Sequence, residues 1–233
     1  MFPYFSPDDW QTILLTIGIA ARAVAVGLPL AVMMAWLLAR RSFPGRAALN
    51  AIVHLPLVLP PVVTGWMLLM LFGAQGPLGA LLRQWAGIRL VFTTEGAALA
   101  SLIMTFPLMV RAIRLALEAI DPGLDEAART LGAGRLDRFI NITLPLAAPG
   151  ILVGAVIAFA TCLGEFGAII TFAGSIPGET QTLPLAIYAA LQTPGGEARA
   201  AQLSAVSILL ALAGLTLADR LGRAINARIG RQG

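Results

Sequence analysis

Residues 13–38 read ILLTIGIAARAVAVGLPLAVMMAWLL, a run whose only charged member is Arg22. A helix of about 20 apolar residues crosses a hydrocarbon core about 30 Å thick, so this run is long enough to span a membrane. Acidic Asp8 and Asp9 precede it, where a signal peptide would carry a basic region, and the run exceeds a signal-peptide core in length. We therefore expect a retained membrane helix at the start of the chain.

The rest of the chain has the same character. It has 233 residues, of which 58% are hydrophobic and 12% charged, and its mean hydropathy is +0.84. These values lie outside the range of soluble domains. The predicted fold class is an all-α polytopic membrane protein with about five transmembrane helices. Charged residues, glycines and prolines bracket the expected spans at about 13–39, 48–72, 96–117, 146–172 and 201–217. The segment 73–94 between the second and third spans is rich in glycine, and 183–191 could form a short helix that is too short to cross.

The distribution of arginine predicts the orientation, because positive charge accumulates in short cytoplasmic loops. All sixteen basic residues are arginine. Three lie on one side of the spans, namely Arg83, Arg89 and Arg199, and Arg22 lies within the first span. The N-terminus is thus expected outside and the C-terminus in the cytoplasm. The remaining twelve lie on the other side: Arg40, Arg41, Arg46, Arg111, Arg114, Arg129, Arg135, Arg138, Arg220, Arg223, Arg228 and Arg231.

Several kinds of chemistry are disfavoured by composition. Cys162 is the only cysteine and His54 the only histidine, so neither a thiolate cluster nor a multi-histidine metal site is expected. A phosphate-binding loop of the G-x-x-x-x-G-K-[ST] type needs lysine, and the chain has none. We predict no enzymatic activity, no metal site and no nucleic-acid partner for this chain, and we take His54 as a packing residue.

The longest polar segment on the cytoplasmic side is 121–145, DPGLDEAARTLGAGRLDRFINITLP. Asp121 can cap a helix that starts at Pro122, because proline lacks the N–H group that would be unpaired there. Gly132 and Gly134 are expected to end this helix, since glycine readily adopts the left-handed conformation. A second short basic helix is expected over 135–140, before a new span starts.

One stripe of the first of these helices is apolar and rich in alanine. It consists of Leu124, Ala127, Ala128 and Leu131, at positions i, i+3, i+4 and i+7. A shallow face of small residues with a charged rim suits docking against another protein. An ordinary solvated loop with a helical turn is the alternative.

The same segment resembles the signature loop of the permeases of binding-protein-dependent importers. The matching positions are Glu126, Ala127 and Ala128, then Gly132 after three residues, then Ile142, Leu144 and Pro145 after nine more. The resemblance extends over about 12–220 and implies a single transmembrane permease domain at 1–233, with a coupling loop at 121–145 and type I ABC importer architecture. In that family the loop forms a coupling helix that sits in a groove of a separate ATPase subunit. The residues then expected to dock are Leu124, Glu126, Ala127, Ala128, Leu131, Gly132, Ile142, Leu144 and Pro145.

Two further stretches resemble molybdate permeases: 57–65, LVLPPVVTG, and 164–168, GEFGA. The resemblance implies uptake of molybdate or tungstate across a bacterial inner membrane. It also implies two copies of an ABC ATPase subunit, which would hold the ATP and Mg²⁺, and an extracytoplasmic molybdate-binding protein. Five spans do not easily enclose a pathway, so we expect a homodimer in membrane lipid, with no cofactor on this chain itself.

The translocation pathway is expected near Pro60 and Pro61, because each proline removes a helical hydrogen bond and distorts the second span. Irregular backbone at membrane depth is tolerated only beside protein or a water-filled cavity. Thr64 and Gly65 follow the kink directly, although a purely structural kink is the alternative. Glu165, placed in the outer part of the fourth span, either faces the cavity or makes a packing hydrogen bond. Its charge would repel an oxyanion.

Three rival functions differ in what they require. A permease for sulfate, thiosulfate or another anion shares the general pattern and differs only in cargo. A proton-coupled secondary transporter using Glu165 would need no ATPase. An intramembrane hydrolase would need a serine or carboxylate partner for His54, and the sequence offers no evident one.

Overall fold

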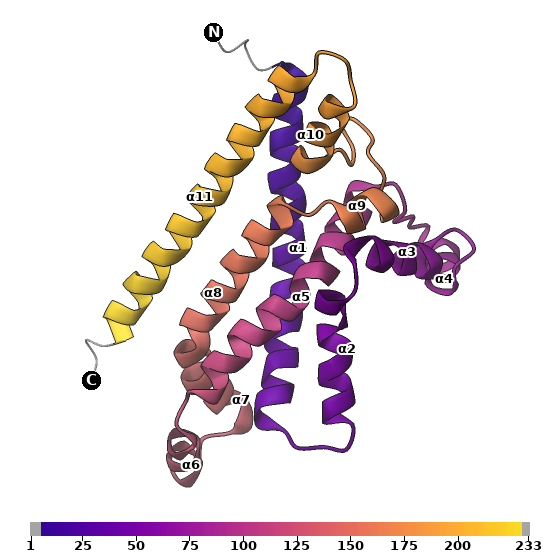
Figure 1. Cartoon of the computed structure of the whole chain (residues 1–233). Helices are drawn as coiled ribbons and strands as arrows, with labels where there is room; N and C mark the ends of the chain where they lie inside the picture. Colours follow the sequence, from indigo (N-terminus) through magenta and orange to yellow (C-terminus); the bar gives the residue numbers. More distant parts are fainter. Residues whose placement is uncertain (1–5, 230–233) are drawn as a thin grey trace.

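The protein is described by a computed structural model over residues 6–229, in which every regular element is helical (Figure 1). A long first helix, α1, runs the length of the bundle, and α11 starts near the N-terminal end of α1 and diverges from it (Figure 1). In chain order the elements are α1 (Pro7–Arg40), α2 (Arg46–Val58), α3 (Pro61–Phe72), α4 (Pro77–Ala86), α5 (Thr94–Glu118), α6 (Pro122–Thr130), α7 (Arg135–Arg138), the π-helical turn η1 (Phe139–Thr143), α8 (Leu144–Leu163), α9 (Gly167–Phe172), α10 (Leu183–Leu191) and α11 (Glu197–Ile229).

The predicted fold class is confirmed. Four helical stretches are long and apolar enough to cross a membrane: α1, α5, the continuous helix Arg135–Leu163 and Glu197–Leu217 of α11. The helices α2 and α3 together form a fifth, bent by 117°. The start of α1 and the end of α11 lie at opposite ends of the bundle, in agreement with termini on opposite sides of the membrane (Figure 1).

The span α5 is the centre of the packing. It contacts α1, α8, α2 and α9, and 61% of its most apolar window is buried inside the chain, against 33% for α1 and 11% for α11. Small residues permit the close approach: a Cβ on Gly150 of α8 would lie 2.2 Å from the Cβ of Ala116. The less buried spans leave apolar surface for lipid or for another subunit.

The second span is distorted at Pro60 and Pro61, as predicted, but it is divided into two helices and is not a single kinked helix. The helix α2 ends at Val58, and α3 begins at Pro61, which has no N–H group to donate to the preceding turn. The bend is too sharp for a kink within one helix. It turns α3 and α4 out to the side of the bundle (Figure 1).

The fourth span also differs from the predicted 146–172. It begins earlier, because α7, η1 and α8 form one helix from Arg135 to Leu163. The π turn accommodates Pro145: the N–H of Leu144 donates to the carbonyl oxygen of Phe139, five residues back. The helix ends at Leu163, and the non-helical segment 164–166 separates it from α9, which begins at Gly167.

The outer side carries three short features. The helix α10 matches the predicted short helix at 183–191, which is too short to cross. The helix α4 lies in what the sequence suggested was a glycine-rich loop. The start of α11 is tied to α1 by an ion pair, in which Arg199 Nη2 lies 2.7 Å from Asp9 Oδ1.

Candidate functional site

The cytoplasmic helix α6 begins as the sequence predicts. Asp121 is its N-cap, and its Oδ1 accepts a hydrogen bond of 2.8 Å from the N–H of Gly123. Pro122 occupies the first helical position. The helix hangs below the rest of the bundle, beyond the ends of α5 and α8 (Figure 1). A short capped helix in this position is held in shape before any partner arrives.

The end of α6 is closed by a Schellman motif centred on Gly132. The N–H of Ala133 donates to the carbonyl of Ala128 at 3.0 Å, and the N–H of Gly132 donates to the carbonyl of Arg129 at 3.1 Å. Gly132 has a φ of +87°, as predicted. The matching prediction for Gly134 is wrong, since its φ is −68° and it is the N-cap of α7.

An ion pair joins the docking helix to the membrane helix behind it. Arg138 Nη1 lies 2.6 Å from Asp125 Oδ2, and the same nitrogen donates to the carbonyl oxygen of Asp125 at 3.3 Å. The Arg138 side chain is 12% exposed. Since Arg138 belongs to the continuous helix Arg135–Leu163, α6 is attached to that span by side chains as well as by backbone.

The residues predicted to dock divide into two groups. Leu124, Glu126, Ala127, Leu131 and Gly132 are exposed, and Leu131 is 88% exposed although it is a leucine. Such exposure of apolar side chains on a polar helix is typical of a contact surface. The residues of the second group contact the rest of the chain to a greater extent: Ala128, Ile142 and Leu144 are half-buried. Pro145, at the start of α8, is exposed.

The residues predicted to line the pathway meet where the two broken spans touch. The helix α3 packs on α9, and glycine is required on both sides of the contact. A Cβ on Gly65 would lie 2.7 Å from the carbonyl oxygen of Ala168, and one on Gly167 would lie 2.7 Å from the Cβ of Pro61. We call this contact the elbow, defined as residues 58–65 and 164–171.

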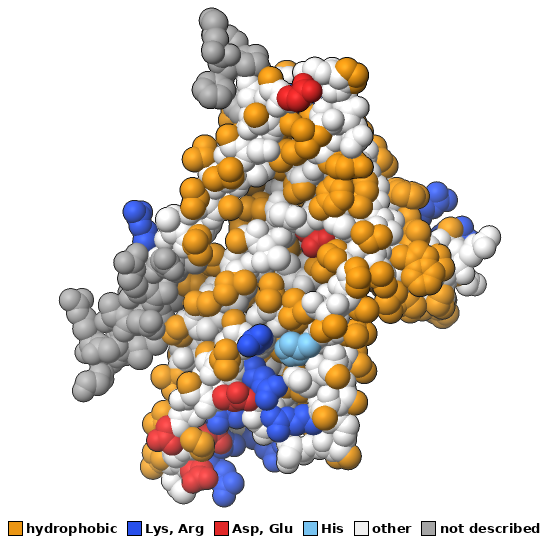
Figure 2. Space-filling model, in the orientation of Figure 1, with side chains coloured by type: hydrophobic (Ala, Val, Ile, Leu, Met, Phe, Trp, Pro, Cys, Tyr) orange, Lys and Arg blue, Asp and Glu red, His pale blue; other side chains and the backbone are white. Residues whose placement is uncertain are grey.

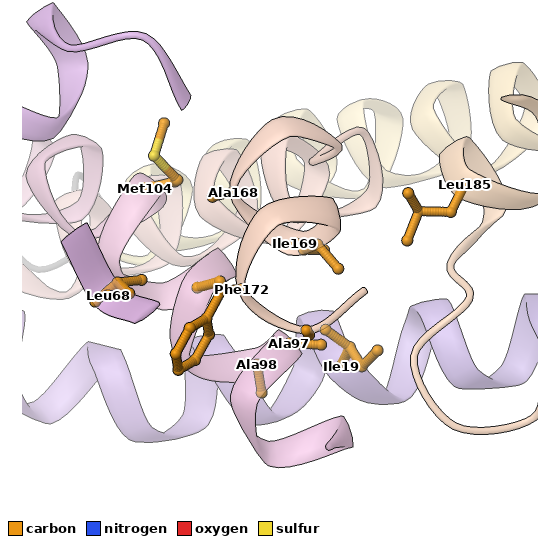
Figure 3. Close-up of a cluster of buried hydrophobic side chains, with 11 residues drawn as sticks. Ile19, Leu68, Ala97, Ala98, Met104, Ala168, Ile169, Phe172 and Leu185 are labelled. Carbon is orange, nitrogen blue, oxygen red and sulfur yellow. The ribbon is translucent and has the colours of Figure 1, made fainter. Parts of the chain in front are cut away.

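An apolar cluster anchors the elbow to the rest of the bundle (Figure 3). Leu68 of α3 and Phe172 of α9 pack with Ile19 of α1 and Ala97 of α5. Phe72 meets Phe172 edge to face, with ring centroids 6.3 Å apart. Ala168 and Ile169 of the elbow belong to the same cluster, so the elbow packs directly against the central helix α5.

Glu165 lies in the break between α8 and α9, not inside a helical span as predicted. It is 8% exposed, and its Oε1 accepts a hydrogen bond of 3.0 Å from the N–H of Ala168, in the first turn of α9. This hydrogen bond is local, between residues three apart, and it satisfies an N–H group in the first turn of α9. Thr64, also buried, has a hydroxyl with no hydrogen-bond partner in the described part of the chain. Pro60 and Pro61 are exposed.

Other chemistry-bearing residues have structural surroundings. Cys162 is buried beside Thr105, with Sγ and Oγ1 3.6 Å apart. His54 is half-buried, and its Nδ1 lies 2.8 Å from the carbonyl oxygen of Asn50, one turn earlier. Within residues 6–229, no group of three or more histidine, cysteine or acidic side chains is arranged to hold a metal ion.

The helix α4, which the sequence analysis did not predict, has a helical signal in its sequence. In α4, Pro77 stands at the first turn and Gly87 has a φ of +67°. Its apolar residues recur at helical spacing, at Leu78, Leu81, Leu82 and Trp85. The role of Gly167, by contrast, depends on a contact with α3, more than 100 residues earlier in the chain, and no local pattern reports such a contact.

These features define a class: a polytopic helical membrane protein with a short, capped and exposed helix between two of its spans and with broken spans at its centre. The family model described as "binding-protein-dependent transport system inner membrane component" matches residues 27–231. The chain belongs to this family.

Individual relatives narrow the comparison. The molybdenum transport system permease protein ModB of Escherichia coli K12 is 54% identical over 96% of this chain and 97% of its own length. Its namesake in Haemophilus influenzae is 48% identical over 93% and 95%. The sulfate transport system permease protein CysT of Salmonella typhimurium is 39% identical over 83% and 70%.

Solved structures of low sequence identity share the fold. A chain of a bacterial alginate ABC transporter, in complex with alginate pentasaccharide-bound periplasmic protein, superposes with a TM-score of 0.76 at 21% identity, covering 94% of this chain and 80% of that one. A chain of the inward-facing MetNI methionine ABC transporter gives a TM-score of 0.65 at 20% identity, covering 93% and 94%. The predicted type I importer architecture is thereby confirmed.

Proposed function

We propose that this chain is the membrane permease subunit of an ATP-driven importer and that its cargo is molybdate, with tungstate as a chemically similar second cargo. The observation that carries the proposal is the capped, exposed helix α6 on a chain of this family. The 54% and 48% identities to molybdenum permeases, against 39% to a sulfate permease, support molybdate over sulfate.

The proposed energy source is a separate ATPase subunit that binds ATP and Mg²⁺ and docks on α6. The exposed Leu124, Ala127 and Leu131 would supply the apolar contact, and Glu126 the polar rim. The Schellman turn and the Arg138–Asp125 ion pair favour this role, because both hold α6 in a fixed position relative to the spans. A rigid docking helix transmits displacement with little loss.

The proposed pathway lies between two copies of the chain, beside the elbow. The outer faces of α2 and α3 leave large apolar residues uncovered, with Val58 82% exposed and Trp66 54% exposed. A second copy placed there would cover this surface and bring two elbows together. Glu165, capping α9, would hold the elbow and not contact the oxyanion, in keeping with its charge.

Cargo selection would then rest mainly with an extracytoplasmic molybdate-binding protein. Conduction requires entry without tight retention, and the elbow, residues 58–65 and 164–171, contains no basic side chain that would hold an anion tightly. For the same reason we propose no resident cofactor on this chain.

The test is a reconstitution of the chain with its ATPase subunit in proteoliposomes. Molybdate-loaded binding protein should stimulate ATP hydrolysis and uptake of radiolabelled molybdate, whereas sulfate-loaded binding protein should stimulate neither. If only the sulfate-loaded binding protein stimulates ATP hydrolysis and uptake, the cargo is sulfate and not molybdate. Uptake that continues without the ATPase subunit and stops with a proton uncoupler would overturn the importer class.

A further inference from the structure

A large groove opens beside the docking helix, on the cytoplasmic half of α1. Its volume is about 1120 Å³, which is above the range of about 300–1,000 Å³ typical of small-molecule pockets. Its walls come from α1, from the junction of α5 with α6, from α6 itself and from α7 with η1. Figure 2 shows the charged side chains gathered at this end of the molecule, below an apolar surface.

The lining of the groove changes character along α1. Its upper part is apolar, formed by Leu30, Met33, Leu37 and Phe106, and one face of α1 continues it downward to Arg40 and Arg41. Leu30 and Arg40 are about 15 Å apart along the helix, at 1.5 Å per residue. The lower part holds arginines from two further elements: Arg129, Arg135 and Arg138.

These arginines have donors to spare. The groove is lined by five arginines against two carboxylates, Asp125 and Glu126. Within the part of the chain that the structure describes, no hydrogen bond or ion pair involves the side chain of Arg129 or Arg135. Arg138 pairs with Asp125 through Nη1, but its Nε is buried without a partner.

Guanidinium groups arranged in this way match the oxygens of a phosphodiester, with which arginine makes paired hydrogen bonds. The apolar half of the groove requires hydrocarbon next to that phosphate. Arg40 and Arg41 end a membrane-crossing helix, which places the arginines at the cytoplasmic interface, where anionic lipids lie. A soluble anion would leave the apolar half uncovered.

We propose that the groove binds one anionic phospholipid of the cytoplasmic leaflet, with its phosphate among Arg129, Arg135 and Arg138 and an acyl chain along Leu30 to Leu37. The lipid bridges α1 and the docking helix, so it fixes the position of α6 relative to the membrane surface. This inference goes beyond the proposed function, and its test does not depend on the cargo.

The test uses native mass spectrometry of the full chain purified in detergent. Phosphatidylglycerol and phosphatidylethanolamine with identical acyl chains compete for it, and phosphatidylglycerol should be retained preferentially. The double variant R129Q/R135Q should reduce this preference about 25-fold, since each interfacial arginine contributes roughly fivefold to the attraction for anionic lipid. The matched control is R111Q, which removes an exposed cytoplasmic arginine that does not line the groove.

Four results of this experiment would overturn the proposal, and a fifth comes from the glycerol phosphate arm described below. They are equal retention of the two lipids, a preference that survives R129Q/R135Q, and an equal loss of preference in R111Q. The fourth is loss of the bound lipid when the ATPase subunit is added, which would make the groove a protein-docking surface. Glycerol phosphate without acyl chains serves as a further arm: it should not displace the lipid, and displacement at equal concentration would assign the site to a soluble anion.

Discussion

Replacing Gly132 by serine tests the docking helix without touching any contact. Gly132 and Gly134 both have open space, with no atom within 4 Å of an added Cβ, but only Gly132 has a positive φ. A non-glycine residue in the left-handed conformation costs about 1–2 kcal/mol. At 1.4 kcal/mol per factor of ten, this strain corresponds to an affinity loss of roughly 5- to 30-fold, provided that the partner requires the native turn.

The measurement is the Kd of the purified ATPase subunit for the chain in lipid nanodiscs. G132S should raise this Kd by about 5- to 30-fold. G134S is the matched control, because its φ of −68° is compatible with serine and serine is a good N-cap. G132N should lie between wild type and G132S, since asparagine tolerates the left-handed region. An unchanged Kd for G132S, or an equal loss for G134S, would refute the reasoning.

Three further changes test the rest of the site. G65A places a Cβ 2.7 Å from the carbonyl oxygen of Ala168 and should destabilise the purified protein by about 1–3 kcal/mol. The control is G18A, whose Cβ meets no atom within 4 Å and which should not lower the melting temperature in a thermal-shift assay. Equal melting temperatures for the two variants would contradict the elbow contact. E165Q keeps the acceptor oxygen that caps α9 and should retain at least half of wild-type uptake, whereas abolished uptake would favour a proton-carrying role. R138Q removes the ion pair between Arg138 and Asp125 of α6. Because the side chain of Asp125 is 53% exposed, the loss should weaken ATPase binding by only about 0.5–1 kcal/mol. A rise in the same Kd of more than tenfold would show that Arg138 contributes to ATPase binding by more than this ion pair.

Composition, together with the charged residues, glycines and prolines that bound the apolar runs, was sufficient to predict most of the architecture. The apolar run 13–38 lies within α1, and the predicted short helix at 183–191 is α10. Asp121, Pro122 and Gly132 act through neighbouring backbone, so their roles can be read from adjacent residues.

The errors have a common physical origin. Hydropathy is continuous across Leu59 and Leu163, so it does not register a break where the apolar character persists on both sides. The break between α2 and α3 falls at Pro60 and Pro61, as predicted, but the packing of α3 against α9 joins segments about 100 residues apart in sequence, and no local pattern reports it. Because hydropathy gives no sign that α8 ends at Leu163, Glu165 was predicted to lie inside a helical span, whereas it precedes α9 and accepts a hydrogen bond from the first turn of α9.

The continuous helix Arg135–Leu163 has a mechanical consequence. At 1.5 Å per residue it is a rod about 43 Å long. At one end, Arg138 forms the ion pair with Asp125 of α6. At the other end, the elbow follows directly after Leu163. A rod of this kind turns a small tilt at its base into a sideways sweep at its tip. The π turn at 139–143 lies near the base of this rod. Under the proposed function, a partner that tilts α6 would move the elbow through this rod.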